Sequence, residues 1–239
     1  MATDADTKGC SGPLWCIVPA AGRGARFGGA IPKQYLPLAG RPLILHTLER
    51  LAAHPRVAGL MVVLAAHDRW WPDVRQVNGK PVRTAIGGSE RVDSVLAGLR
   101  ALPDEIDATQ FVLVHDAARP CLRYEDLGRL IAAGTQAGGA LLGAPLRDTL
   151  KRVDGHCHSI ATEAREARWR AFTPQLFRRG ELTLALERAR SEGVAVTDEA
   201  MAMERTGHRP LLVEGAEDNI KVTTPSDLKL AEFLLERTL

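Results

Sequence analysis

Short runs of consecutive apolar residues alternate along this chain with longer stretches in which apolar residues recur every three or four positions. Four of the runs predict buried strands, at residues 15–18, 60–64, 111–114 and 140–144. Continuous apolar runs are typical of strands that are covered on both faces in a parallel sheet. A fifth strand is expected at residues 211–213.

Stretches with helical spacing lie between these strands. Pro42 begins a helix that carries Ile44, Leu45, Leu48 and Leu51 on one face. The other helices are expected around Trp70 and Trp71, from Ser89 as N-cap through Leu99, around Leu127 to Ile131, from Pro174 to about Arg190, from Thr197 as N-cap, and from Thr224 through Leu235. The alternation predicts an α/β fold in three layers, with a mostly parallel sheet.

The stretch from about 147 to 173 interrupts this alternation. It has no apolar stripe long enough for a core helix, and Asp154-Gly155 is typical of a hairpin turn. We therefore expect a protruding β-arm. His156, Cys157 and His158 near its tip are metal-binding residue types, but a fourth ligand is missing, which favours a solvated turn.

Composition limits the class of protein. The chain has 239 residues, 45% of them hydrophobic and 25% charged, and a net charge of +2. These values predict a single domain over 14–239 with no nucleic-acid signature. Residues 1–13 are small and polar, which predicts a disordered tail. The four cysteines form no CxxC pair, and there is no signal peptide or long apolar run. We expect a cytoplasmic protein with reduced thiols and no membrane contact.

The segment after the first strand is rich in glycine and basic residues. Residues 20–33 read AAGRGARFGGAIPK and contain no acidic side chain. Glycine lets backbone N–H groups approach a phosphate, and Arg23, Arg26 and Lys33 supply the opposite charge. The segment matches neither the Walker A motif nor G-x-G-x-x-G, because Ala30, Ile31 and Phe27 stand at required positions. We interpret it as a triphosphate site, with a mobile surface loop as the alternative.

Two further loops follow predicted strands. HDAARP places Asp116 and Arg119 at the carboxyl end of the third strand, where ligands gather in open α/β sheets. Asp116 is a candidate for holding a ribose hydroxyl or a hydrated metal ion, and a plain ion pair with Arg119 is the alternative. Gly87-Gly88 would let a flat base approach the backbone before the next helix, or would simply form a tight turn.

Taken in order, these motifs resemble those of the 2-C-methyl-D-erythritol 4-phosphate cytidylyltransferase family, the CTP-using enzymes of the non-mevalonate isoprenoid pathway. The similarity runs from about Trp15 to Phe233. It implies a Rossmann-like nucleotidyltransferase sandwich, a homodimer clasped by the β-arm, CTP and methylerythritol phosphate as substrates, and Mg²⁺. We expect a form without a fused cyclodiphosphate synthase. The motifs that carry the resemblance are PAAGRGARFG, PKQYLPLAGRPL, GGSERVDSVLAGL, HDAARP, FTPQLF, TDEA and NIKVTTPSDL.

The resemblance also implies roles for individual residues. Arg26 and Lys33 would stabilise charge on the reacting triphosphate, while Arg165 and Lys221 would position the acceptor. Asp116 would lie near the ribose and the metal-bound phosphates. Contacts to CTP are implied for Ala20, Ala21, Gly22, Gly88, Ser89, Ser94, Asp116 and Ala117, and further acceptor contacts for Thr149, Thr173, Thr197 and Arg119.

The chain departs from the family pattern at two positions. Ser89 stands where an aspartate is common, and Arg168 stands where an apolar residue usually precedes the tryptophan of the arm. Arg165 is chosen among neighbouring arginines by its spacing from Thr173. Two alternatives remain: a ribitol-5-phosphate cytidylyltransferase, which shares the loop and fold, and a nucleotide sensor, which would not need both pairs of cations.

The implied reaction has a specific electrostatic demand. The attacking group is a phosphate monoester, whose second pKa is about 6, so it is already anionic at neutral pH. No general base is needed, and the sequence contains no outstanding Ser-His-Asp arrangement. Because two anions must meet, catalysis is expected to depend on positioning and on cationic stabilisation.

Overall fold

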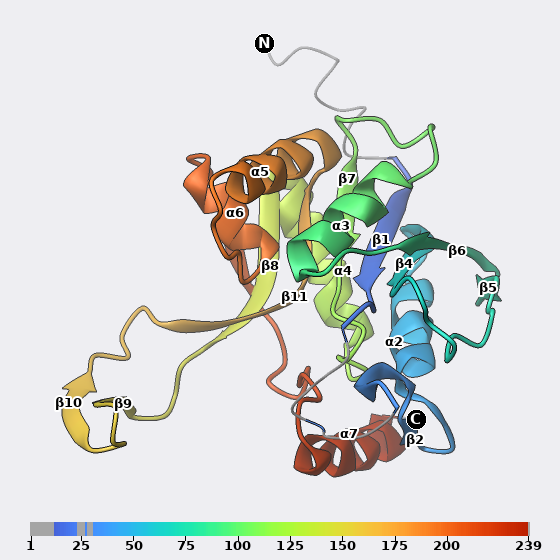
Figure 1. Cartoon of the computed structure of the whole chain (residues 1–239). Coiled ribbons are helices and arrows are strands. Elements are labelled where there is room, and N and C mark those ends of the chain that lie inside the picture. The colour runs from blue at the N-terminus through green and yellow to red at the C-terminus, as the bar shows by residue number, and fades with distance from the viewer. Residues whose placement is uncertain (1–11, 23–26, 28–30, 239) are drawn as a thin grey trace.

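A mixed sheet of eight strands forms the centre of the computed structural model, in the order β12-β8-β11-β7-β1-β4-β6-β5 (Figure 1). The structure describes residues 12–22, 27 and 31–238. Residues 1–11 of the predicted tail lie outside this range, so the disordered tail stays a prediction.

Six strands of the sheet, β1, β4, β6, β7, β8 and β12, run in one sense, and β11 and β5 run in the opposite sense. In one half β1, β4, β6 and β7 are parallel, and in the other β8 and β12 are parallel to each other. β11 lies between β7 and β8 and is antiparallel to both, and β5 adds antiparallel to β6. The bounds are β1 (Leu14–Pro19), β4 (Val57–Leu64), β5 (Gln76–Val77), β6 (Lys80–Ile86), β7 (Phe111–Val114), β8 (Gly139–Pro145), β11 (Trp169–Arg178) and β12 (Leu211–Glu214), with a separate pair β2 (Pro37–Leu38) and β3 (Arg41–Pro42).

Helices cover both faces of the sheet. Side chains of a strand alternate between faces, and β1 illustrates this: Cys16 and Val18 pack with α2 (Leu43–Ala52) and α4 (Tyr124–Ala137), whereas Ile17 packs on the opposite side. That opposite side is covered by α3 (Arg91–Arg100), α5 (Arg179–Ser191) and α6 (Glu199–Arg205). The predicted three-layer α/β fold is confirmed.

A smaller apolar cluster attaches the last helix. Ala231 and Leu235 of α7 (Pro225–Thr238) pack with Leu38, Leu43 and other residues beside the small β2–β3 sheet. This packing holds the end of the chain next to the segment that carries the glycine-rich loop. Among the helices that the structure describes, none has both the length and the apolar character that a bilayer crossing requires.

Three predicted helix boundaries were wrong. The helix expected from Pro174 begins only at Arg179, because residues up to Arg178 continue β11 and pair with β7. The N-cap of α3 is Glu90, which forms a capping box with Asp93, and Ser89 precedes it. The N-cap of α6 is Asp198, whose carboxylate accepts the Met201 N–H at 2.9 Å.

The segment after β4 was also mispredicted. Trp70 and Trp71 lie in a non-helical loop, in which both backbone N–H groups are donated to Asp68 Oδ1 at 2.8 and 3.0 Å. These local Asx-type hydrogen bonds to Asp68 compete with helix formation.

The sequence analysis also missed β6, because its exposed side chains interrupt the apolar pattern.

The β-arm lies away from the sheet (Figure 1). β9 (Leu150–Val153) and β10 (Ser159–Glu163) pair antiparallel with each other, joined by the predicted turn at Asp154. The Asp154 carboxylate accepts the N–H groups of His156 and His158, and these side chains are exposed. At the base of the arm, Trp169 pairs with Pro145 of β8.

Candidate active site

Two adjoining cavities lie where β1 and β7 end. Strand register explains the location, because Ile17 pairs with Val114 and the loops that follow both strands emerge together. Arg91, Asp116 and Lys221 line both cavities and therefore form the wall between them. The first cavity is further lined by residues that include Ala20, Ala21, Gly22, Lys33, Gln34, Gly88, Ser89, Glu90, Ser94 and Ala117, and the second by Arg119, Phe172, Thr173, Gln175, Thr197 and Asp198.

Three cationic groups surround the Asp116 carboxylate. Lys221 Nζ lies 2.9 Å from Oδ2, Arg119 Nε lies 3.3 Å from the same oxygen, and Arg91 Nη2 lies 3.4 Å from Oδ1. Burial alone would raise the pKa of Asp116, but Arg91, Lys221 and Arg119 outweigh it and hold the pKa well below its usual range. Asp116 is therefore an anion that organises three positive charges.

Arg91 has a second acidic partner that the sequence analysis did not single out. Glu199, the first residue of α6, is fully buried and receives both terminal nitrogens of Arg91, with Nη2 3.0 Å from Oε2. Burial would lower the pKa of Arg91, but the charges of Glu199 and Asp116 raise it. The two residues are 108 positions apart, so no local pattern could have paired them.

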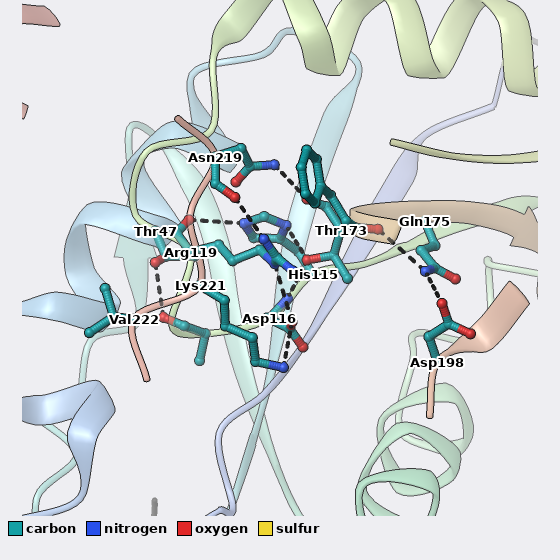
Figure 2. A network of polar contacts seen from close by, with 12 residues as sticks. Thr47, His115, Asp116, Arg119, Thr173, Gln175, Asp198, Asn219, Lys221 and Val222 are labelled. Atoms are coloured by element: carbon teal, nitrogen blue, oxygen red, sulfur yellow. Dashed lines mark hydrogen bonds and ion pairs between the residues drawn. The ribbon is translucent and has the colours of Figure 1, made fainter. Parts of the chain in front are cut away.

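A buried polar network holds the backbone next to Asp116 (Figure 2). His115 Nε2 lies 3.1 Å from the Arg119 carbonyl oxygen and Nδ1 lies 3.0 Å from Thr173 Oγ1, which also accepts the Asp116 N–H. The carbonyl must accept from Nε2–H, so Nδ1 accepts from the threonine hydroxyl. Burial lowers the pKa of His115 to about 4, which keeps the ring neutral at physiological pH.

The loop before Lys221 is tied to the same network. Asn219 is fully buried, donates from Nδ2 to the Thr173 carbonyl at 2.8 Å, and accepts Arg119 Nη1 at its own carbonyl at 2.6 Å. Val222 N–H is donated to the Ala118 carbonyl at 2.8 Å. These bonds fix the backbone on both sides of Lys221.

Lys33 is held at the boundary of the first cavity. It lies in the short 3-10 helix η2 (Lys33–Tyr35), and its Nζ donates to the Val222 carbonyl at 3.0 Å. Gln34 is buried and donates to the Ala20 carbonyl at 2.6 Å, which attaches η2 to the end of β1. Arg26, the other predicted catalytic cation, lies outside the described residues, as do residues 23–25 and 28–30.

The glycines of the first cavity differ in their surroundings. A Cβ added to Gly22 would meet nothing within 4 Å, so the space beside it is open. A Cβ on Gly88 would lie 2.4 Å from Asp93 Cβ. Gly88 is thus required for close packing against the start of α3, which supports the tight-turn interpretation at that position.

The helix starts bring hydroxyl groups to the cavities. Ser94 is buried on the first turn of α3 and donates to the Glu90 carbonyl at 3.2 Å, and Ser89 is exposed and lies 3.4 Å from Asp93 Oδ2. Thr197 lies just before α6 and borders the second cavity. Gln175 donates to Asp198 at 3.0 Å, which attaches the start of α6 to β11.

Comparison with known proteins identifies this arrangement. The family model described as 2-C-methyl-D-erythritol 4-phosphate cytidylyltransferase matches residues 14–237. The chain belongs to this family. It is therefore related to nucleotidyltransferase enzymes over almost its whole length.

Individual members of the family support this assignment. The chain is 59% identical to the 2-C-methyl-D-erythritol 4-phosphate cytidylyltransferase of Stenotrophomonas maltophilia K279a, over 95% of this chain and 98% of the relative. It is 60% identical to the enzyme of the same name from Xanthomonas campestris pv. campestris 8004, over 94% and 85%. The crystal structure of the Francisella tularensis 2-C-methyl-D-erythritol 4-phosphate cytidylyltransferase superposes with a TM-score of 0.80 at 32% identity, over 93% and 100%.

Two residues that the family resemblance singled out lie elsewhere in the described chain. Arg165 is exposed in the arm and donates to the Arg147 carbonyl, and Thr149 is exposed just before β9. Neither is among the described residues that line the two cavities. A single chain of this cytidylyltransferase family member therefore brings Lys221, but not Arg165, to the wall between the cavities.

The described residues offer little to a directly bound metal ion. Mg²⁺ takes oxygen ligands, commonly one or two carboxylates together with substrate phosphates. No cluster of three or more His, Cys, Asp or Glu side chains among the described residues could hold a metal. Both oxygens of Asp116 already face cations, so this site does not fit Mg²⁺ bound to Asp116 alongside those contacts.

Proposed function

We propose that this chain transfers the cytidylyl group of CTP to 2-C-methyl-D-erythritol 4-phosphate and releases pyrophosphate, in isoprenoid precursor biosynthesis. The observation that carries the proposal is the shared wall of Arg91, Asp116 and Lys221 between two cavities. A reaction between two phosphate compounds needs two pockets that meet at one cationic boundary. Family membership supplies the identity of the two substrates.

The chain's residues match a mechanism without a general base. The acceptor phosphate is anionic near neutral pH and attacks the α-phosphorus of CTP, so the new O–P bond forms as the bond to pyrophosphate breaks. His115 is neutral, buried and bonded at both nitrogens, and is therefore a structural residue. The protein's contribution is orientation of the two phosphates and stabilisation of their negative charge.

The first cavity is proposed to bind CTP. Lys33 would exchange the Val222 carbonyl for the reacting phosphates, where Arg26 would join it, and these two residues are the proposed catalytic cations. Ala20, Ala21 and Gly22 would contact the triphosphate, because the space beside Gly22 is open. Gly88, Ser89 and Ser94 are proposed to surround the base, with Asp116 and Ala117 near the ribose.

The second cavity is proposed to bind the acceptor. Lys221 and Arg119 border it and would receive the acceptor phosphate. Thr173 and Thr197 border the same space, where hydroxyl groups suit the polyol. Thr149 and Arg165 reach this cavity in our proposal only from the arm of a second chain.

Mg²⁺ is the proposed cofactor, with phosphate oxygens of CTP as its principal ligands. Phosphate oxygens are proposed as the ligands, and not Asp116, because the Asp116 carboxylate is already surrounded by three cations. A role of Asp116 toward the metal would therefore be indirect, through bound water.

The proposed assembly is a homodimer clasped by the β-arm, in the cytoplasm. Leu150, Val153 and Ile160 are exposed on the arm strands, which suits packing against another surface. Burial raises the pKa of Cys121 to about 12, and the described cysteines are free thiols, as is usual in the cytosol.

A substrate panel tests the proposed function. Pyrophosphate release from CTP and Mg²⁺ is measured with methylerythritol phosphate, ribitol 5-phosphate and glycerol 3-phosphate as acceptors. We expect kcat/KM for methylerythritol phosphate to exceed that for ribitol 5-phosphate at least about 100-fold, because a missing or misplaced hydroxyl leaves polar groups of the pocket unpaired. Equal or better turnover of ribitol 5-phosphate would replace the proposed acceptor.

A further inference from the structure

Arg91 and Glu199, the first residues of α3 and α6, form a largely buried, bidentate ion pair. Arg91 Nη1 and Nη2 are both donated to the Glu199 carboxylate, and Glu199 is 0% exposed. A planar guanidinium that meets a carboxylate with both nitrogens is fixed in direction as well as in place. The pair therefore sets the orientation of the Arg91 head group.

That orientation matters because of what Arg91 faces next. The nitrogen that is bonded to Glu199 Oε2 also lies 3.4 Å from Asp116 Oδ1, on the boundary of both cavities. Asp116 in turn lies 2.9 Å from Lys221 Nζ. A chain of contacts thus runs from buried Glu199 through Arg91 and Asp116 to Lys221.

Charge balance gives Glu199 a further effect. The cluster contains three cations, Arg91, Arg119 and Lys221, and two anions, Asp116 and Glu199. Without Glu199, Asp116 would be the one anion among the four groups that remain, and Asp198 would be the other carboxylate whose charge acts on Arg91. Arg91 would then turn toward Asp116 and compete there with Lys221.

We infer that Glu199 is a positioning residue, which holds Arg91 so that Asp116 and Lys221 keep their places where the two phosphates meet. This inference rests on the proposed function, because it assigns the shared wall to the reacting phosphates. Glu199 itself touches neither cavity and acts only through Arg91.

Glu199→Gln and Arg91→Lys test the inference. Glutamine keeps the size of the side chain but offers one acceptor oxygen, and lysine keeps the charge but cannot form the bidentate hydrogen bonds of a guanidinium group. We expect each variant to lower kcat by about 10- to 100-fold, the effect of a small displacement at reacting groups. The Kd for CTP, measured by calorimetry without acceptor, should change by less than about twofold, and the KM for the acceptor should not rise by more than that.

Two controls separate positioning from loss of stability. Leu186→Ala removes a buried side chain of α5 away from the cavities, and it should lower the Tm with little effect on kcat at a temperature well below unfolding. Glu187→Gln breaks the exposed pair with Arg100 at the opposite end of α3 and should change neither quantity appreciably. The double variant Arg91→Lys, Glu199→Gln should be no slower than the slower single variant, because both changes disable one unit.

Three results would overturn the inference: normal kcat in both folded single variants, a loss confined to CTP affinity, or multiplication of the two single effects in the double variant. If Glu199→Gln does not fold, Arg91→Lys retains the buried carboxylate partner and decides by itself. Failure of the proposed function is distinguishable, because wild type would then prefer another acceptor. The same kinetic comparison is made with that acceptor.

Discussion

His115 shows how a motif residue can support the site although it is not among the described residues that line either cavity. It follows β7 directly, is fully buried, and joins the Arg119 carbonyl to Thr173. Its neighbours bond to the neutral ring, and burial lowers its pKa to about 4. An unfolded histidine has a pKa of about 6.5, so the unfolded chain binds this proton first as the pH falls.

The sign of the resulting pH dependence follows. Between about pH 6.5 and pH 4 the unfolded state binds the proton and the folded state does not, so stability decreases as pH falls through this window. One such group contributes a slope of up to about 1.4 kcal/mol per pH unit. In urea unfolding of the wild type and His115→Gln, we expect the free energy of unfolding of the wild type to decrease more steeply from pH 6.5 to 4. Parallel curves would show that His115 titrates normally.

The two strands of the β-arm have few contacts with the rest of their own chain. β9 and β10 pair only with each other among the described strands, and the side chains of β9 are exposed. A two-stranded hairpin is marginal in water without further packing. In the main sheet, by contrast, β8 and β11 pair with each other from Pro145 and Trp169 onward, without any contribution from the arm. Fold stability should therefore reside in the sheet, and the arm should serve assembly.

Shortening the arm tests this division. Replacing residues 147–167 with Asn-Gly joins Leu146 to Arg168, which are already bonded across β8 and β11, through a two-residue hairpin turn. We expect a monomer by light scattering, with a Tm within a few degrees of wild type, retained CTP binding and no transfer to the acceptor. Arg165→Ala in the full-length arm is the control and should stay dimeric. A dimer with the shortened arm would place the interface elsewhere.

At the scale of the whole molecule, the two predicted acceptor cations lie apart. Lys221 is in the wall between the cavities, and Arg165 is in the arm. Two-fold symmetry would let each arm complete the other chain's site. A complete site would then contain Lys33 and Lys221 of one chain and Arg165 of its partner.

Mixing two inactive variants tests shared sites. Lys33→Ala should lower kcat by roughly 10²-fold, as loss of a preorganised charge-stabilising group does, and Arg165→Ala should impair acceptor positioning. A mixed dimer has one site with both defects and one with neither, so activity should return to as much as half the normal level per dimer. Subunit exchange is verified with differently tagged chains. Exchange without recovered activity would place Arg165 in its own chain's site.

Local sequence patterns determined most of the layers of this protein. The apolar runs at 15–18, 60–64, 111–114 and 140–144 are all buried strands, because a strand covered on both faces needs consecutive apolar residues. The apolar stripes of α2, α3 and α4 were equally sufficient, since each helix packs one face against the sheet. The motifs at the ends of these strands likewise located the described lining of the first cavity, because parallel strands end at one edge.

Only the tertiary structure decided the features that depend on partners distant in sequence. β11 is a strand beyond Pro174 because β7 and β8 offer hydrogen bonds on both sides, and a local pattern cannot reveal such neighbours. Arg91 and Glu199 look like ordinary surface charges in sequence, and the fold brings the first residues of α3 and α6 together, so that the arginine meets a fully buried carboxylate. The same holds for Arg91 and Lys221 beside Asp116, whereas the pair of Asp116 with Arg119 was one of the alternatives that the HDAARP motif offered. Electrostatic interactions act through space at a few ångströms, and the fold alone sets those distances.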